Sequence, residues 1–246
     1  MGTCLDWHSS VVDALPQAVP EVARFKLALD WRQEFFNELY ARSRQGLAPE
    51  DIDITHRRTL LRVLDREPNR EYSHHFLGAG RSTCLTCGNE GYGSPSVESA
   101  VASWHRMSAW PDVLPALTAL KTDLDVELFV LANGTTRLQL DLVRASGLAG
   151  NFDMLLSSEL LGVYKPDPEA FAKALNLVRA RPDEAVMVAA HAYDLRAARQ
   201  LGMNTIYVSR WTDDIGENMD DIRRENNVFL SEGGMRGLVD AITALG

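Results

Sequence analysis

The chain has 246 residues, of which 46% are hydrophobic and 24% are charged, and its formal net charge is -9. These proportions are typical of globular proteins and exclude wholesale disorder and fibrous architectures, while the acidic balance excludes a nucleic-acid backbone as the main partner. No apolar run approaches the roughly 20 residues that a bilayer span needs, and no signal-peptide pattern opens the chain, so a cytoplasmic protein without membrane attachment is expected.

Helical periodicity dominates the chain up to about residue 101. It is clearest in residues 31–43 and 51–64, and no comparable series of buried strands occurs in this part. We therefore expect a helical cap over residues 9–101, inserted into an α/β core that is formed by residues 1–8 and 102–246.

Aromatic residues recur at helical spacing in the expected cap. The spacing of Phe35, Phe36 and Tyr40 is that of residues in one helix. It predicts that these side chains pack within the cap and do not line a substrate channel. Residues 78–93 contain several glycines and two cysteines. This composition predicts an irregular connection within the cap.

A metal site is an alternative interpretation of two cysteines in the expected cap. Cys84 and Cys87 have zinc-like spacing, and His74 and His75 precede them. A complete zinc signature shows two well-spaced pairs, whereas these histidines are adjacent, so buried or reduced thiols are favoured over a metal site. With Cys4 the chain has only three cysteines, which argues against a disulfide framework.

Strand and helix patterns alternate in the second half of the chain. Short apolar runs predict strands, and amphipathic stretches between them predict helices, the last of which begins at Asp194 and ends at Gly202. Such alternation predicts an α/β class protein with a Rossmann-like parallel sheet, right-handed crossovers and helices on both faces. The predicted strands are residues 126–132, 152–157, 185–190 and 204–208, and the other predicted helices are residues 135–146 and 165–178.

Polar side chains follow three of these strands. Asn133 follows the first strand, Lys165 lies in the loop after the second, and Asp194 lies after the third, close to His191. Each alone is typical of a turn, a helix entry or a helix cap. Because ligands bind beyond the carboxyl ends of parallel strands, we expect the four to face one cleft that orients an anion and positions water.

Four ordered stretches carry a resemblance to a known family. Residues 1–7, 131–135, 164–168 and 191–194 resemble the motifs of the haloacid dehalogenase superfamily, and within it the type II 2-haloacid dehalogenases, particularly their fungal relatives. The similarity covers nearly the whole chain, including residues 31–33. The resemblance implies hydrolytic dehalogenation of a small 2-haloalkanoic acid through a covalent aspartyl ester, which divides one hard step into two easier ones.

The first motif of that family begins with the nucleophilic aspartate. Met1, Gly2 and Thr3 match its last three positions, so the aspartate and the strand that carries it would precede Met1. Asp6 lies beyond the matching Gly-Thr turn, and at roughly 3.3 Å per extended residue it is too far displaced to replace the aspartate.

The resemblance also implies roles for the matched residues. Thr3 would line the pocket beside the nucleophile, and Arg32 would meet the substrate carboxylate or the departing halide, a bidentate task that suits guanidinium. Asn133 would contribute to the anion pocket. The resemblance implies a homodimer. It implies neither a metal ion nor a cofactor.

The remaining three residues would serve the chemical steps. Lys165 would hold the nucleophile ionised, and Asp194 would fix Lys165 and help to activate water. His191 stands where bacterial relatives usually have Asn, and its ordinary pKa near neutrality suits a general base.

Departures from the family pattern keep other functions open. Ala132 and Ala189 stand where bacterial dehalogenases have serine, and Phe171 where they often have tyrosine, so another substrate is an alternative. A magnesium-dependent phosphatase is a second alternative, disfavoured because Met1 occupies the position of the acidic proton donor. A catalytically dead binding protein is the third.

Acidic pairs near the C-terminus complete the candidate residues. Asp213 and Asp214, and Asp220 and Asp221, do not have the spacing of a calcium-binding loop. We expect them to be solvated loop charges.

Overall fold

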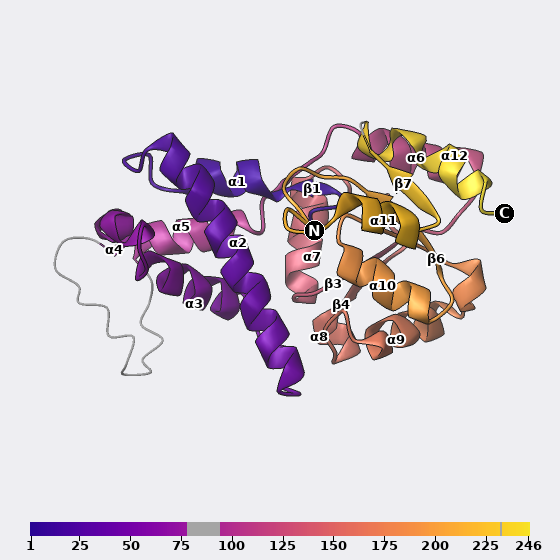
Figure 1. Cartoon of the computed structure of the whole chain (residues 1–246), viewed down its shortest axis with the longest axis horizontal. Helices are drawn as coiled ribbons and strands as arrows, with labels where there is room; N and C mark the ends of the chain where they lie inside the picture. Colours follow the sequence, from indigo (N-terminus) through magenta and orange to yellow (C-terminus); the bar gives the residue numbers. More distant parts are fainter. Residues whose placement is uncertain (78–93, 232) are drawn as a thin grey trace. The chain divides into compact units, whose positions relative to one another are not determined.

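The chain forms two compact units, which the computed structural model describes over residues 1–77, 94–231 and 233–246. A core unit contains Met1–Asp6 and Ser108–Gly246, and a helical unit contains Trp7–Met107 (Figure 1). The junctions expected from the sequence, after residues 8 and 101, differ from these by two and six residues. The predicted irregular connection at residues 78–93, with Cys84 and Cys87, lies outside the described residues.

Capping residues set the boundaries of several helices in the helical unit. Asp51 accepts a hydrogen bond from the backbone N–H of Asp53 and begins α3, and Ser94 accepts one from Val97 and begins α5. The helices predicted over residues 31–43 and 51–64 are confirmed as parts of α2 and as α3. The elements are α1 Trp7–Ala14, α2 Glu21–Arg44, α3 Ile52–Leu64, η1 Asn69–Tyr72, α4 Ser73–Leu77 and α5 Pro95–Ser103.

Tryptophan side chains fill the centre of the helical unit. The ring of Trp104 stacks on Trp7 at 5.9 Å and meets Trp31 edge to face at 5.2 Å. Phe35 is buried there as predicted, but Tyr40 is 57% exposed, so the packing prediction is wrong for Tyr40. Five residues on a helix of 3.6 residues per turn rotate the side chain by about 140°, which takes Tyr40 away from the face that Phe35 buries.

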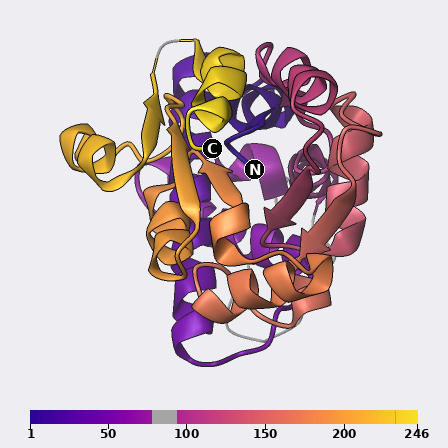
Figure 2. The same cartoon turned by 90° about the vertical axis from the view of Figure 1, so that its right-hand side faces the viewer.

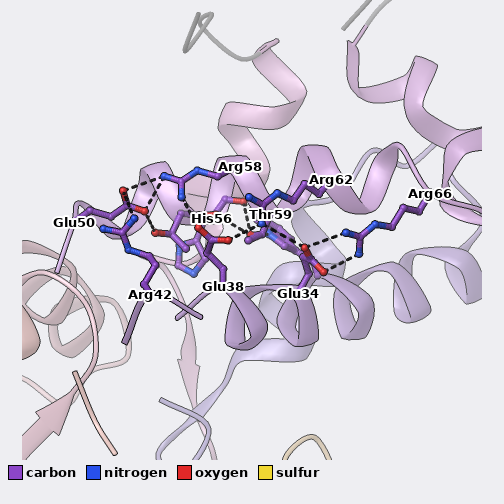
Figure 3. A network of polar contacts seen from close by, with 11 residues as sticks. Glu34, Glu38, Arg42, Glu50, His56, Arg58, Thr59, Arg62 and Arg66 are labelled. Carbon is purple, nitrogen blue, oxygen red and sulfur yellow. Dashed lines mark hydrogen bonds and ion pairs between the residues drawn. The ribbon is translucent and has the colours of Figure 1, made fainter. Parts of the chain in front are cut away.

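Ion pairs join α2 to α3 along their length, as Figure 3 shows. Glu38 pairs with Arg58 and with Arg62, each at 2.6 Å, and Glu34 pairs with Arg66 at 2.8 Å. Glu34 and Glu38 are four residues apart on α2, and Arg58 and Arg62 are four residues apart on α3, so each helix presents a row of charge to the other; Arg66 extends the row just beyond the end of α3. Burial alone would raise the pKa of Glu38, but the guanidinium groups of Arg62 and Arg58 outweigh it and lower this pKa below its ordinary value.

The core unit has parallel strand pairs, which confirms the predicted α/β class. The four predicted strands are observed as β3, β4, β5 and β6, and β6 is paired on its other side with β7, which the sequence analysis did not predict. The strands are β1 Leu5–Asp6, β2 Ser108–Ala109, β3 Phe129–Ala132, β4 Met154–Ser157, β5 Val186–Ala189, β6 Asn204–Val208 and β7 Val228–Leu230.

The parallel strands form two sheets rather than the single sheet that the alternation predicts. β3 pairs with β4 in one sheet, and the other has the order β5-β6-β7 (Figure 2). Among the described residues, β3 and β5 therefore each have one edge without a strand partner. β1 and β2 form a separate antiparallel pair.

Helices connect the strands of the core unit. Thr135 caps α7 by accepting from the N–H of Leu138, and Asp167 caps α9, which begins with Pro168. Asp194 was expected to head its helix, but it lies in the first turn, and His191 occupies the cap position. The helices are α6 Val113–Asp123, α7 Thr136–Ala145, α8 Ser158–Leu161, α9 Pro168–Val178, η2 Pro182–Glu184, α10 Ala192–Gln200, α11 Met219–Glu225, η3 Gly234–Gly237 and α12 Leu238–Thr243.

One hydrophobic cluster is shared by the two sheets. Phe171 of α9 and Ala198 of α10 are buried in it together with Leu156 of β4. Leu131 of β3 and Met187 of β5 pack against the same cluster. The two sheets are therefore fixed to the same helices although β3 and β5 are not hydrogen-bonded to each other.

Candidate active site

Lys165 and Asp194 form a buried ion pair in the core unit. The ammonium nitrogen Nζ of Lys165 lies 2.6 Å from Oδ2 of Asp194, and only 9% and 3% of the two side chains are exposed. The second carboxylate oxygen, Oδ1 of Asp194, is buried and accepts no hydrogen bond from the described residues. The pair therefore places a fixed positive charge beside a carboxylate oxygen that can still accept a proton from water.

Asn133 fixes the backbone of Lys165. Its Nδ2 donates to the carbonyl oxygen of Lys165 at 2.9 Å, and its Oδ1 accepts from the backbone N–H of Lys165 at 2.8 Å. Because the amide oxygen and one N–H are engaged in this way, one N–H remains for an anion. The loop after β4 is thus tied to the end of β3.

Thr3 lies at the carboxyl end of β5. Its hydroxyl accepts a hydrogen bond from the backbone N–H of Ala190 at 3.0 Å. Gly2 precedes it with a backbone so close to Asp213 that a Cβ atom at this position would lie 2.2 Å from a carboxylate oxygen. A side chain at position 2 would therefore force the buried carboxylate of Asp213 to move, which favours glycine at this turn.

His191 lies between two carboxylates. Its Nε2 is 3.4 Å from Oδ1 of Asp213, and its Nδ1 is 3.5 Å from Oδ1 of Asp214. The other oxygen of Asp214 accepts from the backbone N–H of Ala192 at 2.6 Å, at the first turn of α10. Burial and the charges of Asp214 and Asp213 raise the pKa of the nearby Tyr207.

The prediction that Asp213 and Asp214 are solvated loop charges is wrong. Asp213 is 5% exposed, and only 9% of the Asp214 side chain is exposed. The loop turns back onto the N-terminus of α10, where backbone N–H groups and the helix dipole favour a carboxylate. Asp220 is exposed, as expected.

Arg32 belongs to the helical unit, where aromatic rings surround it. It is 5% exposed, and its guanidinium carbon lies 4.4 Å from the ring centre of Phe36, 5.1 Å from that of Trp7 and 5.4 Å from that of Trp104. Aromatic faces attract a cation in this geometry and hold its plane. Arg32 is therefore a cation on a rigid apolar support.

Arg210 is a charged residue near the site that the sequence analysis missed. It follows β6, and its guanidinium forms a two-pronged contact with Asp112 and donates to the carbonyl oxygen of Thr3. The signal was available, since residues after the end of a predicted parallel strand are the ones that face a ligand. Applied to the strand at 204–208, this rule points to residues 209–214.

Two further properties of the described residues bear on function. No group of three or more His, Cys, Asp or Glu side chains gathers there in a way that suits a metal ion. No helix in the described ranges combines the length and apolar character that crossing a membrane requires.

Comparisons with known proteins agree with the motifs. Residues 2–202 match the family model of the haloacid dehalogenase-like hydrolases. An (S)-2-haloacid dehalogenase of Pseudomonas sp. (strain CBS-3) is 32% identical over 108 residues, which are 44% of this chain and 47% of that protein. The (S)-2-haloacid dehalogenase of Xanthobacter autotrophicus is 25% identical over 209 residues, which are 85% of this chain and 72% of that protein.

A solved structure is similar over nearly the full length. The crystal structure of an L-2-haloacid dehalogenase superposes with a TM-score of 0.74 and 31% sequence identity, and the match covers 99% of this chain and 95% of that one. The match to the Pseudomonas protein, in contrast, spans about half of that relative's length. Since the family model covers most of the chain and the fold agrees, the chain belongs to the haloacid dehalogenase-like hydrolases and is an enzyme of that type.

Proposed function

We propose that this hydrolase removes the halide from small 2-haloalkanoic acids. The observation that carries the proposal is the buried Lys165–Asp194 pair, which Asn133 fixes to the end of β3. Proteins named as 2-haloacid dehalogenases stand among its relatives and among the similar solved structures, which supports this substrate class. The substrate is an anion, and cationic side chains suit its recognition.

The proposed reaction has two steps. A carboxylate oxygen of the enzyme attacks C2 of the substrate, and the halide leaves with the bonding electron pair, so that an ester forms. Water then attacks the carbonyl carbon of this ester, the bond between that carbon and the substrate oxygen breaks, and the 2-hydroxy acid departs. One proton is released and the enzyme carboxylate is regenerated.

The described side chains have distinct tasks in this scheme. The ammonium group of Lys165 keeps the attacking carboxylate ionised and offsets the charge of ester hydrolysis. Oδ1 of Asp194 accepts a proton from the attacking water. Arg32 binds the substrate carboxylate or the departing halide, and the free N–H of Asn133 adds a donor for the anion.

The attacking carboxylate is proposed to lie on a strand that pairs with both β3 and β5. Within the described ranges these strands have one unpaired edge each, and Leu131 and Met187 pack against a shared cluster. Thr3, at the end of β5, is the last residue of the matching motif. The proposed strand therefore precedes Met1 and ends where its carboxylate meets Lys165.

The experiment is a halide-release assay with 2-chloropropionate on the chain preceded by the residues encoded upstream of Met1. We expect halide release, and Lys165→Met is expected to abolish it. A folded protein that releases no halide at saturating 2-haloacid contradicts the proposal. Hydrolysis of an aryl phosphate with magnesium, in its place, would favour the phosphatase alternative.

Isotope labelling tests the ester. In a single turnover in H₂¹⁸O with excess enzyme, the label is expected in the enzyme carboxylate, because water attacks the ester carbonyl carbon. The 2-hydroxy acid then carries unlabelled oxygen. Label in the product of the first turnover would show direct attack of water and would exclude the covalent step.

We also propose that the enzyme is a cytoplasmic homodimer, as the family resemblance implies. The chain has a mass of 27.3 kDa. Sedimentation equilibrium is expected to give twice this value, and a monomer at all concentrations would contradict the proposal.

A further inference from the structure

The loop of residues 209–214, which follows β6, carries buried charges toward two different segments. At one end, Nε of Arg210 donates to the carbonyl oxygen of Thr3 at 3.1 Å. Its two terminal nitrogens donate to the two oxygens of Asp112 at 3.0 and 2.8 Å. Only 8% and 9% of the two side chains are exposed, so this contact is formed in a weakly screened environment where two-pronged geometry is strongest.

Further contacts hold the same region of Arg210 and Asp112. Oδ2 of Asp112 also accepts from the backbone N–H of Met235 at 2.6 Å. The guanidinium lies 5.1 Å from the ring centre of Trp110, whose Nε1 donates to the carbonyl oxygen of Gly2 at 2.8 Å. Arg210 therefore sits in a rigid frame from which it holds the backbone of Thr3.

At the other end of the loop, Asp214 holds the first turn of α10. One of its oxygens accepts from the N–H of Ala192 at 2.6 Å, and the other lies 3.5 Å from Nδ1 of His191. Asp214 has a φ of 53°, a left-handed conformation that is unfavourable for most residues other than glycine. The contacts to α10 offset this cost, and the same turn of α10 carries Asp194.

We infer that Arg210 and Asp214 are positioning residues of the proposed dehalogenase. Arg210 acts through Thr3, and Asp214 acts through the turn that presents Asp194 to Lys165. Neither forms a hydrogen bond or ion pair with Lys165 in the described part of the chain. The 209–214 loop thereby sets the separation between the pocket wall at Thr3 and the water-activating carboxylate, and a displacement of about 1 Å in such a geometry costs about 100-fold in rate.

The inference rests on the proposed function. A kinetic test distinguishes the ester-forming step of the proposed reaction from the hydrolysis of the ester. Asp214→Ala is expected to slow ester hydrolysis about tenfold or more, while the burst of halide and KM change less than threefold. Asp214→Asn keeps an acceptor for Ala192 but loses the charge, and it should recover part of the rate. Asp220→Asn, an exposed acid of α11, is the matched control and should behave as the parent.

A second measurement does not require turnover. In Arg210→Lys, amide hydrogen exchange at Ala190 should rise about tenfold, because the acceptor of this N–H is the hydroxyl of Thr3, which Arg210 holds from the other side. Exchange at Leu156, in β4, should stay unchanged and shows that the variant is folded.

The possible results distinguish a failure of the inference from a failure of the proposed function. Unchanged exchange at Ala190 in Arg210→Lys, or ester hydrolysis within twofold of the parent in Asp214→Ala, overturns the inference. If the parent releases no halide while the exchange at Ala190 rises as expected, the proposed function fails and the positioning role of Arg210 stands.

Discussion

Nζ of Lys165 lies 2.6 Å from Oδ2 of Asp194, and both side chains are almost wholly buried. Removing two charges from water costs free energy, and their mutual attraction offsets this cost only while both are present. Such a pair contributes little net stability but fixes an ammonium group in one place. It is therefore better explained by chemistry at the carboxyl end of the strands than by the needs of folding.

The first prediction concerns the stability of this pair. Lys165→Met and Asp194→Leu should each destabilise the protein by about 3–5 kcal/mol, because each leaves a buried charge without its partner. The double variant should lose clearly less than the sum of the two. Urea unfolding of the four proteins measures the difference, and strict additivity would show that the two charges do not interact.

The second prediction concerns Arg32. Arg32→Lys should raise KM for 2-chloropropionate about tenfold or more with a smaller change in kcat, because an ammonium group cannot lie flat on Phe36 and bind a carboxylate with two parallel donors. Arg44→Lys is the matched control, since Arg44 lies over the exposed ring of Tyr40 on the same helix. Equal KM values for Arg32→Lys and the parent would remove Arg32 from substrate binding.

The third prediction concerns the ion pairs between α2 and α3. Glu38→Gln should destabilise the helical unit by about 1 kcal/mol, and 1 M salt should reduce this difference. Tryptophan fluorescence reports this unit, because Trp7, Trp31 and Trp104, three of the five tryptophans, lie in it. Glu169→Gln, which breaks an exposed pair on α9, should cost less than half as much.

Acid should also weaken the contribution of Glu38. Its pKa is lowered in the folded protein, below the ordinary value of 4.5. The stabilisation is therefore complete above pH 4.5 and is lost as the pH falls through the folded value. The difference between parent and Glu38→Gln should narrow in this range, and a difference independent of pH would contradict the assignment.

The fourth prediction concerns His56. Burial, and then the charge of Arg32, lower the pKa of His56 well below its ordinary value of 6.5. Below pH 6.5 the unfolded chain binds a proton that the folded protein excludes, so stability should fall by up to roughly 1.4 kcal/mol per pH unit on acidification. Above pH 6.5 this contribution is constant.

Substitution isolates this effect. His56→Leu should remove the loss of stability between pH 6.5 and about 5, where carboxylates contribute little. His74→Leu, at an exposed position, is the control and should leave the slope unchanged. A parent protein with no pH dependence in this window would show that His56 titrates normally in the folded state.

The sequence predicts local structure well where a pattern of residues is compatible with only one type of secondary structure. The apolar run of residues 204–208 is β6 residue for residue, and Thr135 and Asp167 begin their helices as helix-capping residues do. The family follows from four short motifs in the right order. These features depend on neighbours in the chain, which a sequence shows directly.

Features that depend on distant parts of the chain are harder to predict. The burial of Asp213 and Asp214 is set by their approach to α10, and an acidic pair in a loop has the same local pattern when it is solvated. Apolar runs also do not encode which strand edges meet, so the separation of β3 from β5 is not predictable from them. The contacts of Arg210 with Asp112 and Thr3 also join distant parts of the chain, so a local pattern does not predict them.

The contact of Arg210 with Thr3 joins positions 207 residues apart, whereas the helical unit is one continuous stretch of chain. During synthesis on the ribosome, the helical unit is complete before β5 and β6 exist, and contacts within it close short loops quickly. Residues 108–110 reach the first residues earlier, through β2 and Trp110, but the hydroxyl and carbonyl groups of Thr3 gain their partners only after residues 190 and 210 have emerged. Translation therefore completes the surroundings of Thr3 in two stages, and the second stage comes late in synthesis.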